Sequence, residues 1–488
     1  MTSPIPDGAA DWTADELAAA LTATSEWAVR YRERVAEFPV FPQVAPGETQ
    51  ARLAPCPPRD AESLDRVLAD MDDIIVPGLT HWNHPGFFAY FSSAARGPSV
   101  VAELLIAAVG VNAMLWRTSP AATELEAVVV DWLRQAVGLP EEFRGMILDT
   151  ASTSSFTSIL AARERADGAV RESGVDPVGR PALISYVSDQ AHPSIEKSVI
   201  AAGLGRASVR RIPSDSEFRM DPGALETAIG QDVTAGSRPM VIVATLGTTS
   251  TASMDPVSEI APIAARCGAW LHVDAAYAGS AALLPETRGA FEGWERADSI
   301  IINPHKWLGT SLDCSVLFFR DGAPFREALS LTPAYLASEH DDVTNLMDFA
   351  LPLGRRFRAL KLWLLFRCVG TRGLADTLRT HIAWAREFAE ALESGPHFEL
   401  VAPVGFSTVC FRAIGGGEGH ASDVLNRSVL ERVNRAGDAF ISHTEVGGSY
   451  TLRVSIGSVH TRAADVETAL RRLEEAVDAE LEDHGRTG

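Results

Sequence analysis

The sequence predicts an α/β protein with a mostly parallel sheet. Between about residues 97 and 365, short runs rich in Val and Ile alternate with Ala-rich stretches of helical character. Most gaps between these runs are long enough for the crossover helices that parallel strands require. The chain has 488 residues, 46% of them hydrophobic, so we expect two or three domains with a large core.

The N-terminal region begins with an amphipathic pattern at residues 13–37, for which Thr13 is a plausible N-cap. A connector containing six prolines (Pro39, Pro42, Pro46, Pro55, Pro57 and Pro58) and a second helical stretch near 61–75 follow. Two helices and a proline-rich connector bury little apolar surface by themselves. We therefore expect residues 1–96 to pack on another surface, for which a neighbouring subunit is one candidate.

The central region, residues 97–365, contains the clearest strand-like runs, at 182–187, 240–246, 270–275, 299–302 and 315–319. The last gap is short and suits a tight return. The longest apolar stretch, 99–116, is interrupted by Glu103 and Asn112 and is too short for a membrane span, so we predict a buried helix there. Residues 366–488, with an amphipathic pattern at 374–392 and a Gly-rich turn at 415–419, predict a smaller α+β domain.

Composition excludes several classes of function. With 43 Lys+Arg against 64 Asp+Glu the formal net charge is −21, which disfavours nucleic acid and anionic membranes as partners. The first residues lack the basic start and apolar core of a signal peptide, so we expect a cytoplasmic protein. The five cysteines are scattered, which predicts free thiols and neither a disulfide framework nor a metal site.

Polar side chains follow four of the predicted strands, in the segments SDQAHPS (188–194), TLGTTST (245–251), HVDAAYAG (272–279) and NPHKWLG (303–309). They supply an imidazole (His192), hydroxyls, a carboxylate (Asp274) and an amine (Lys306). Working residues of open α/β sheets lie at the carboxyl ends of the strands. We therefore expect these groups to lie together.

Lys306 directly follows an apolar strand, where desolvation would lower its pKa and make the amine a nucleophile toward an aldehyde. An isolated lysine at a strand end more often extends into solvent. Asp274 could keep a pyridine nitrogen protonated and His192 could cover a flat ring, although alone each is more often structural. The hydroxyl cluster at 150–155 precedes a helical stretch and suits a phosphate, with helix capping as the alternative.

Seven stretches together resemble one family, the group II pyridoxal-phosphate decarboxylases, and within it the aromatic-L-amino-acid decarboxylases. They are HPGFFAYF (84–91), SPAATELE (119–126), SDQAHPSIEKS (188–198), ATLGTTST (244–251), WLHVDAAYAGSA (270–281), NPHKWL (303–308) and PLGRRFRALKLW (352–363). The resemblance runs from about His81 to the C-terminus. It implies the aspartate aminotransferase fold (fold type I) and an obligate homodimer with sites at the interface.

The resemblance also implies roles for matching residues. Lys306 would bind the aldehyde of pyridoxal 5'-phosphate covalently, Asp274 would pair with the pyridine nitrogen, and His192 would stack on the ring. Four residues match positions around the cofactor phosphate: Ala151, Ser152, Asn303 and His305. Thr249 and Ala276 match positions that line the cofactor. Tyr335 matches the tyrosine of a mobile loop that closes over the site of the partner subunit and delivers a proton to the α-carbon.

The implied reaction converts an aromatic L-amino acid to the arylalkylamine and carbon dioxide. In related plant enzymes phenylalanine in place of Tyr335 accompanies oxidative formation of an aldehyde, so tyrosine here favours the amine. An acidic substrate would need an arginine in residues 84–91, which have none, although Arg96 is near. A non-catalytic cofactor-binding homologue is disfavoured because the principal site residues are all retained.

Substrate choice depends on an aromatic stretch and one glycine. Trp82, Tyr90, Phe91 and Ser93 fall where the family's side-chain pocket lies, and aromatic walls suit aromatic substrates. Gly354 matches a position where glycine leaves space for an indole, which favours tryptophan over tyrosine, dopa or phenylalanine without excluding them. Ser92, Asn112 and Met114 depart from the family pattern, which leaves the ranking of aromatic substrates open.

Overall fold

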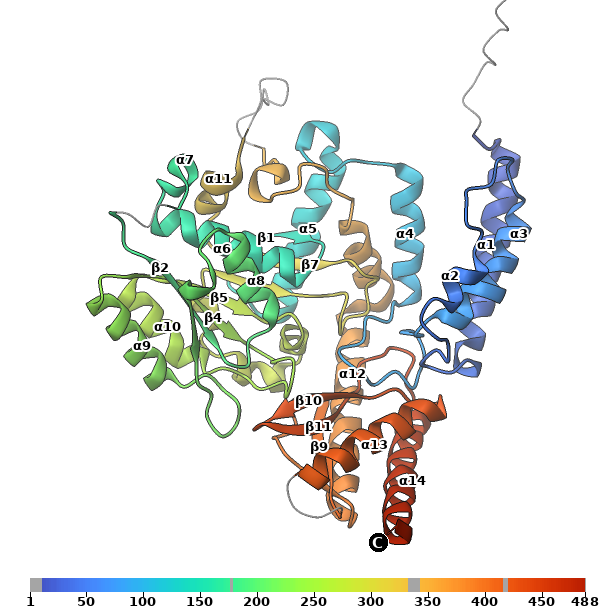
Figure 1. The fold of residues 1–488 in the computed structure, drawn as a ribbon. Helices are drawn as coiled ribbons and strands as arrows, with labels where there is room; N and C mark the ends of the chain where they lie inside the picture. Colours follow the sequence, from blue (N-terminus) through green and yellow to red (C-terminus); the bar gives the residue numbers. More distant parts are fainter. Residues whose placement is uncertain (1–10, 176–178, 332–342, 416–419, 488) are drawn as a thin grey trace, which may run out of the picture.

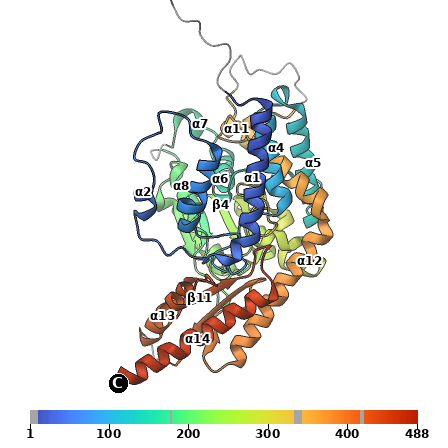
Figure 2. The ribbon, with the colours of Figure 1, turned by 90° about the vertical axis from the view of Figure 1, so that its right-hand side faces the viewer.

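The structure, a computed structural model, describes residues 11–175, 179–331, 343–415 and 420–487. Three parts are visible in Figures 1 and 2: an α/β body, a smaller α/β unit beneath it, and an N-terminal helical segment that stands to one side. This arrangement follows the order of the chain, from blue to red in Figure 1.

The body contains a seven-stranded sheet of order β1-β7-β6-β5-β4-β2-β3. Neighbouring strands from β3 to β6 run parallel, whereas β7 is antiparallel to both β6 and β1. The strands are β1 (Arg144–Leu148), β2 (Leu183–Ser188), β3 (Val209–Ile212), β4 (Arg238–Thr245), β5 (Trp270–Asp274), β6 (Ser299–Ile302) and β7 (Ser315–Phe319). The α/β prediction is confirmed. β7 returns antiparallel to β6, as the short gap suggested, but through residues 303–314 rather than a tight turn. The sequence patterns missed β1 and β3.

Both faces of this sheet are covered, which explains the continuous apolar runs of its central strands. Val241 and Val243 of β4 join a core with helices α6 and α8, whereas Ile242 and Ala244 join the opposite core with α5, α9 and α10. The α-helices of the body are α4 (Gly97–Val109), α5 (Pro120–Val137), α6 (Ala151–Ala166), α7 (Val170–Ser173), α8 (Pro193–Ala201), α9 (Pro222–Thr234), α10 (Val257–Cys267) and α11 (Ala323–Leu329).

The smaller unit has an antiparallel sheet of order β10-β11-β9-β8. Its strands are β8 (Phe398–Leu400), β9 (Thr408–Ala413), β10 (Ser442–Val446) and β11 (Ser449–Ser455), and α13 (His420–Ala436) and α14 (Ala463–Thr487) accompany them. Helix α12 (Ala359–Ser394) connects the two units, and its helical geometry breaks at Gly370, where φ is 72°. The predicted boundary at 365/366 lies inside α12, shortly before this break.

The N-terminal segment contains α1 (Ala14–Arg34), α2 (Glu48–Arg52) and α3 (Leu64–Asp70). Thr13 caps α1 in a reciprocal capping box with Glu16, as the sequence predicts for its start. No residue of α1 is buried in the chain. Helix α1 therefore adds no buried side chain to the core, whereas Phe87, Phe88 and Ala89, which also lie within residues 1–96, are fully buried.

The prediction of a buried helix at 99–116 is wrong for the single chain. Helix α4 ends at Val109, where Gly110 adopts a left-handed C-cap, and only Ser99, Ala102 and Ile106 are buried. Its other face exposes apolar side chains to a degree of 39–53%: Val100, Val101, Leu104, Leu105 and Val109. The residues between 97 and 109 are apolar on both faces, so the pattern does not tell which face lies inside this subunit.

Candidate active site

A pocket of about 190 Å³ lies at the carboxyl ends of β4, β5 and β6. Its walls gather most of the residues predicted from strand ends and from the resemblance. The lining residues are Phe91, Thr150, Ala151, Ser152, His192, Thr245, Gly247, Thr249, Asp274, Ala276, Tyr277, Asn303, His305 and Lys306. All nine residues predicted to bind the cofactor are among them.

The parallel strands position the two groups of opposite charge. Asp274 is the last residue of β5 and pairs in register with Thr245 of β4, and its Oδ1 accepts the backbone N–H of Ala276 at 3.1 Å. β6 ends at Ile302, and a turn closed by a bond from the Lys306 N–H to the Asn303 carbonyl places the lysine beside the same sheet edge. The carboxylate and the amine therefore share one pocket.

The environment favours the neutral amine of Lys306. Burial lowers the pKa of Lys306, and the nearby Arg453 guanidinium acts in the same direction, whereas Asp274 opposes them. The Lys306 Nζ lies 5.1 Å from the centre of the Phe91 ring. A neutral amine is the nucleophilic form, so this pocket suits attack on an aldehyde.

The N-terminus of α6 forms one wall of the pocket. Thr150 precedes this 16-residue helix without a side-chain cap, so the first-turn N–H groups around Ala151 and Ser152 remain available to a ligand. The same pocket is lined by Asn303, whose buried Oδ1 has no hydrogen-bond partner among the described residues, and by His305. Helix N–H groups and neutral polar donors suit a phosphate.

The imidazole of His305 is fixed by its own chain. The Cys314 backbone N–H donates to its Nδ1 at 2.9 Å, and the Asn303 amide lies 3.3 Å from its Nε2. Burial lowers the pKa of His305 to about 4, and the Lys306 charge adds to this effect. The ring is therefore neutral at physiological pH, and its proton lies on Nε2, which faces the Asn303 amide.

The donor set fits pyridoxal 5'-phosphate. An amine for the aldehyde, a carboxylate for the ring nitrogen and a helix N-terminus for the phosphate occur in one pocket. The unpartnered Oδ1 of Asn303 and Oγ1 of Thr245 are buried polar atoms that a bound ligand could satisfy. Among the described residues there is no cluster of His, Cys, Asp or Glu that could hold a metal ion.

The predicted substrate residues are distributed differently. Of the five, only Phe91 lines this pocket. Trp82 and Tyr90 stack on each other with ring centres 5.9 Å apart, and are 39% and 54% exposed. Gly354 lies beside Asn112, away from the pocket of its own chain. Ser93 is outside the pocket lining, and Tyr335 lies outside the described residues.

Tyr277 and Arg453 were not among the residues predicted for the site. Tyr277 lines the pocket and stacks on Phe91 at 3.8 Å, with its hydroxyl 2.7 Å from the Ser407 Oγ of the smaller unit. Arg453 of β11 lies 4.6 Å from the centre of the Phe91 ring and donates to the Tyr90 carbonyl at 2.7 Å. An arginine between Leu452 and Val454 in an apolar strand was the signal that could have revealed it.

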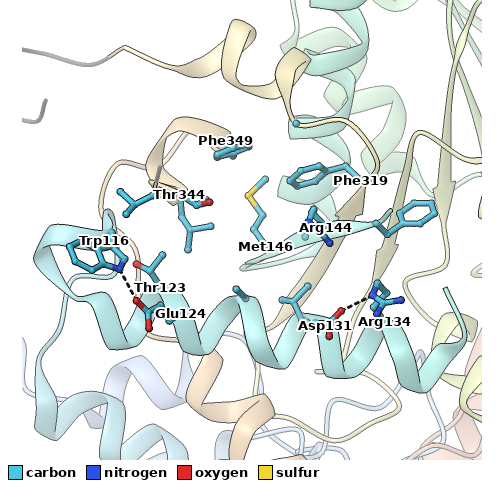
Figure 3. Close-up of a pocket in the computed structure, with 17 residues that line it drawn as sticks. Trp116, Thr123, Glu124, Asp131, Arg134, Arg144, Met146, Phe319, Thr344 and Phe349 are labelled. Carbon is cyan, nitrogen blue, oxygen red and sulfur yellow. Dashed lines mark hydrogen bonds and ion pairs between the residues drawn. The ribbon is translucent and has the colours of Figure 1, made fainter. Parts of the chain in front are cut away.

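A second, larger pocket of about 640 Å³ lies between α5, β1 and the η10 turn (Leu346–Phe349) (Figure 3). Met146, Phe319 and Phe349 point into it, and at one end the Trp116 indole donates to Glu124 at 2.8 Å. Its described lining contains no lysine, histidine or cysteine. It therefore lacks an amine that could hold an aldehyde cofactor.

Comparison with known proteins agrees with this geometry. The model of the pyridoxal-dependent decarboxylase conserved domain matches residues 46–414. Tryptophan decarboxylase 1 of Oryza sativa subsp. japonica is 39% identical over 91% of this chain and 90% of its own. Phenylacetaldehyde synthase of Arabidopsis thaliana is 38% identical over 91% and 92% of the two chains.

The fold comparison gives the same result. The crystal structure of Oryza sativa TDC with PLP and tryptamine superposes with a TM-score of 0.93 at 36% identity, over 97% of this chain and 100% of that one. Among the described residues no helix is long and apolar enough to cross a membrane.

The family model and the similar relatives together show that the chain belongs to the pyridoxal-dependent decarboxylase family and, within it, to the aromatic-L-amino-acid decarboxylases.

Proposed function

We propose that this protein decarboxylates an aromatic L-amino acid in the Lys306 pocket, with an indole side chain as the preferred substrate. The juxtaposition of Lys306 and Asp274 in one pocket of a pyridoxal-dependent decarboxylase carries the proposal. The Oryza sativa structure that resembles this chain contains PLP and tryptamine, an indole amine. The aromatic Phe91 and Tyr277 at the pocket wall suit a substrate of this kind.

Different residues of the pocket are proposed to hold different parts of the cofactor. Bound pyridoxal 5'-phosphate supplies an aldehyde for the substrate amine and a ring that accepts the electron pair left by carbon dioxide. Lys306 would hold the aldehyde until substrate arrives, and its lowered pKa keeps the amine reactive. Asp274 would keep the ring nitrogen protonated, while the first turn of α6, Asn303 and His305 would anchor the phosphate.

Tyr335 is proposed to return a proton to the α-carbon, with His192 nearby. The competing outcome, oxidation to an aldehyde, is the activity named for the similar phenylacetaldehyde synthase. Purified holoenzyme should be incubated with tryptophan, tyrosine, dopa and phenylalanine while amine, carbon dioxide and peroxide are measured. We expect amine and carbon dioxide in equal amounts. Peroxide and aldehyde as main products would overturn the amine assignment.

A homodimer is proposed as the working unit. The apolar outer face of α4 and the unburied helix α1 leave surfaces that a second copy of the chain would cover. A site shared between subunits also accounts for the position of Gly354 beside Asn112, away from the Lys306 pocket of its own chain. A cytoplasmic location is proposed because all five cysteines are free thiols, which suits a reducing compartment.

A further inference from the structure

The first turn of α8 provides an unusual support for the site histidine. His192 is the N-cap of this helix, a position usually held by Ser, Thr, Asp or Asn. Its Nδ1 accepts the backbone N–H of Ser194 at 3.2 Å, and the Ser194 Oγ lies 2.7 Å from the same nitrogen. Ser194 is buried, with 7% of its surface exposed, and its carbonyl accepts the Ser198 hydroxyl at 2.7 Å.

These contacts determine where the imidazole carries its proton. A backbone N–H can only donate, so Nδ1 must present a lone pair to it. The serine hydroxyl can rotate and donate to the same nitrogen. In the neutral ring the proton is then on Nε2, which has no hydrogen-bond partner among the described residues although His192 lines the pocket.

We propose that Ser194 is a positioning residue that holds His192 as the Nε2–H tautomer, so that His192 presents a hydrogen-bond donor to the pocket. The inference rests on the proposed function for its catalytic meaning, because an N–H group beside the substrate can hydrogen-bond to the reacting groups and orient them while the neutral ring keeps its own proton. A base at the same position would remove a proton instead and would favour other reactions at the α-carbon.

The charges around His192 come from three elements. Burial by the surrounding chain is the largest influence and lowers the pKa of His192. Asp274 on β5 raises this pKa, whereas Lys306 after β6 and Lys197 on α8 lower it. Protonation of Nδ1 would also break the hydrogen bonds that the Ser194 N–H and hydroxyl make to this nitrogen. The cap and the burial therefore act in the same direction, toward a neutral ring.

The first test is the tautomer itself. The full-length holoenzyme labelled with ¹⁵N-histidine contains 12 histidines, and the signal lost in His192→Gln identifies the relevant ring. We expect, at neutral pH, an unprotonated Nδ1 and a protonated Nε2. A proton on Nδ1 would overturn the proposal. This measurement does not depend on which substrate the enzyme takes, so it separates failure of the inference from failure of the proposed function.

The second test is the pH profile of kcat. Ser194→Ala removes one donor to Nδ1 and so makes protonation easier, which should move the acid limb to higher pH by about 0.5 to 1 unit. Ser194→Thr retains the hydroxyl and should restore the limb. Ser198→Ala, one turn further along the same buried face, removes a hydroxyl that touches no imidazole and is the matched control. An acid limb that coincides in Ser194→Ala and Ser198→Ala would contradict the role of Ser194.

Discussion

A buried ion pair supports the strand that leads into the phosphate wall, and breaking it should cost a large part of the protein's stability. Glu126 and Arg355 lie 2.7 Å apart with side chains only 1% and 3% exposed. Glu126 accepts the Ile147 N–H at 2.8 Å, and Arg355 donates to the Ile147 carbonyl at 2.8 Å. The pair thus takes the place of a neighbouring strand at the edge of β1, directly before Ala151 and Ser152.

The expected magnitude follows from what each substitution leaves behind. Glu126→Ala leaves the Arg355 charge buried without a counter-charge, which costs about 3 to 5 kcal/mol. It also orphans the Ile147 N–H, which adds about 1 to 3 kcal/mol, and Arg355 already has one buried nitrogen, Nη1, without a partner. Glu126→Gln keeps an oxygen for the Ile147 N–H and should cost less than Glu126→Ala.

The assay is urea unfolding at fixed protein and saturating cofactor concentration, so that binding does not change between variants. Glu286→Gln is the control, because the Glu286–Arg379 pair has the similar distance of 2.6 Å but side chains that are 51% and 46% exposed. Its loss should change the free energy of unfolding little, because solvent screens an exposed pair. Equal losses in Glu126→Ala and Glu286→Gln would refute the reasoning.

Four further predictions follow from the site and its surroundings. Gly354→Ser should lower kcat/KM for tryptophan relative to tyrosine, because the serine side chain would occupy space that an indole needs. A Cβ at position 354 meets only the Asn112 amide, at 3.8 Å, so the variant should fold. An unchanged ratio would remove Gly354 from the substrate site. Leu104→Glu should shift light scattering from dimer toward monomer, and a retained dimer would exclude the α4 face as the interface. Tyr335→Phe should lower amine yield and raise peroxide; identical products and rates would withdraw the proton-donor role. Thermal stability should fall as pH drops from about 6.5 toward 4. Over this range histidines of the unfolded chain bind protons, whereas five buried histidines with pKa lowered to about 4 stay neutral in the folded chain. They are His84, His272, His305, His381 and His460. A flat melting temperature over this range would contradict their neutral burial.

The sequence predicted the central sheet well because both of its faces are buried. Five apolar runs correspond to β2, β4, β5, β6 and β7, and the polar residues after them meet in one pocket. β1 was missed because its outer end, Arg144 and Gly145, carries no β-branched residue, and β3 because Val209–Ile212 contains two arginines. Edge strands have fewer neighbours and therefore weaker patterns.

The remaining failures concern contacts between distant parts of the chain. Arg453 lies in the smaller unit and contacts the ring of Phe91, a residue of the pocket wall, across a long sequence separation that local patterns do not encode. The exposure of one face of α4 was missed because this helix is apolar on both of its faces, so its sequence pattern does not distinguish the exposed face from the buried one.

The most direct test of the account is to locate the covalent bond to the cofactor. Holoenzyme treated with borohydride, digested and analysed by mass spectrometry should carry the reduced pyridoxal phosphate on the peptide that contains Lys306, and Lys306→Ala should carry none and release no carbon dioxide from any aromatic amino acid. A label on another lysine, or normal decarboxylation by Lys306→Ala, would contradict the assignment of this pocket as the active site.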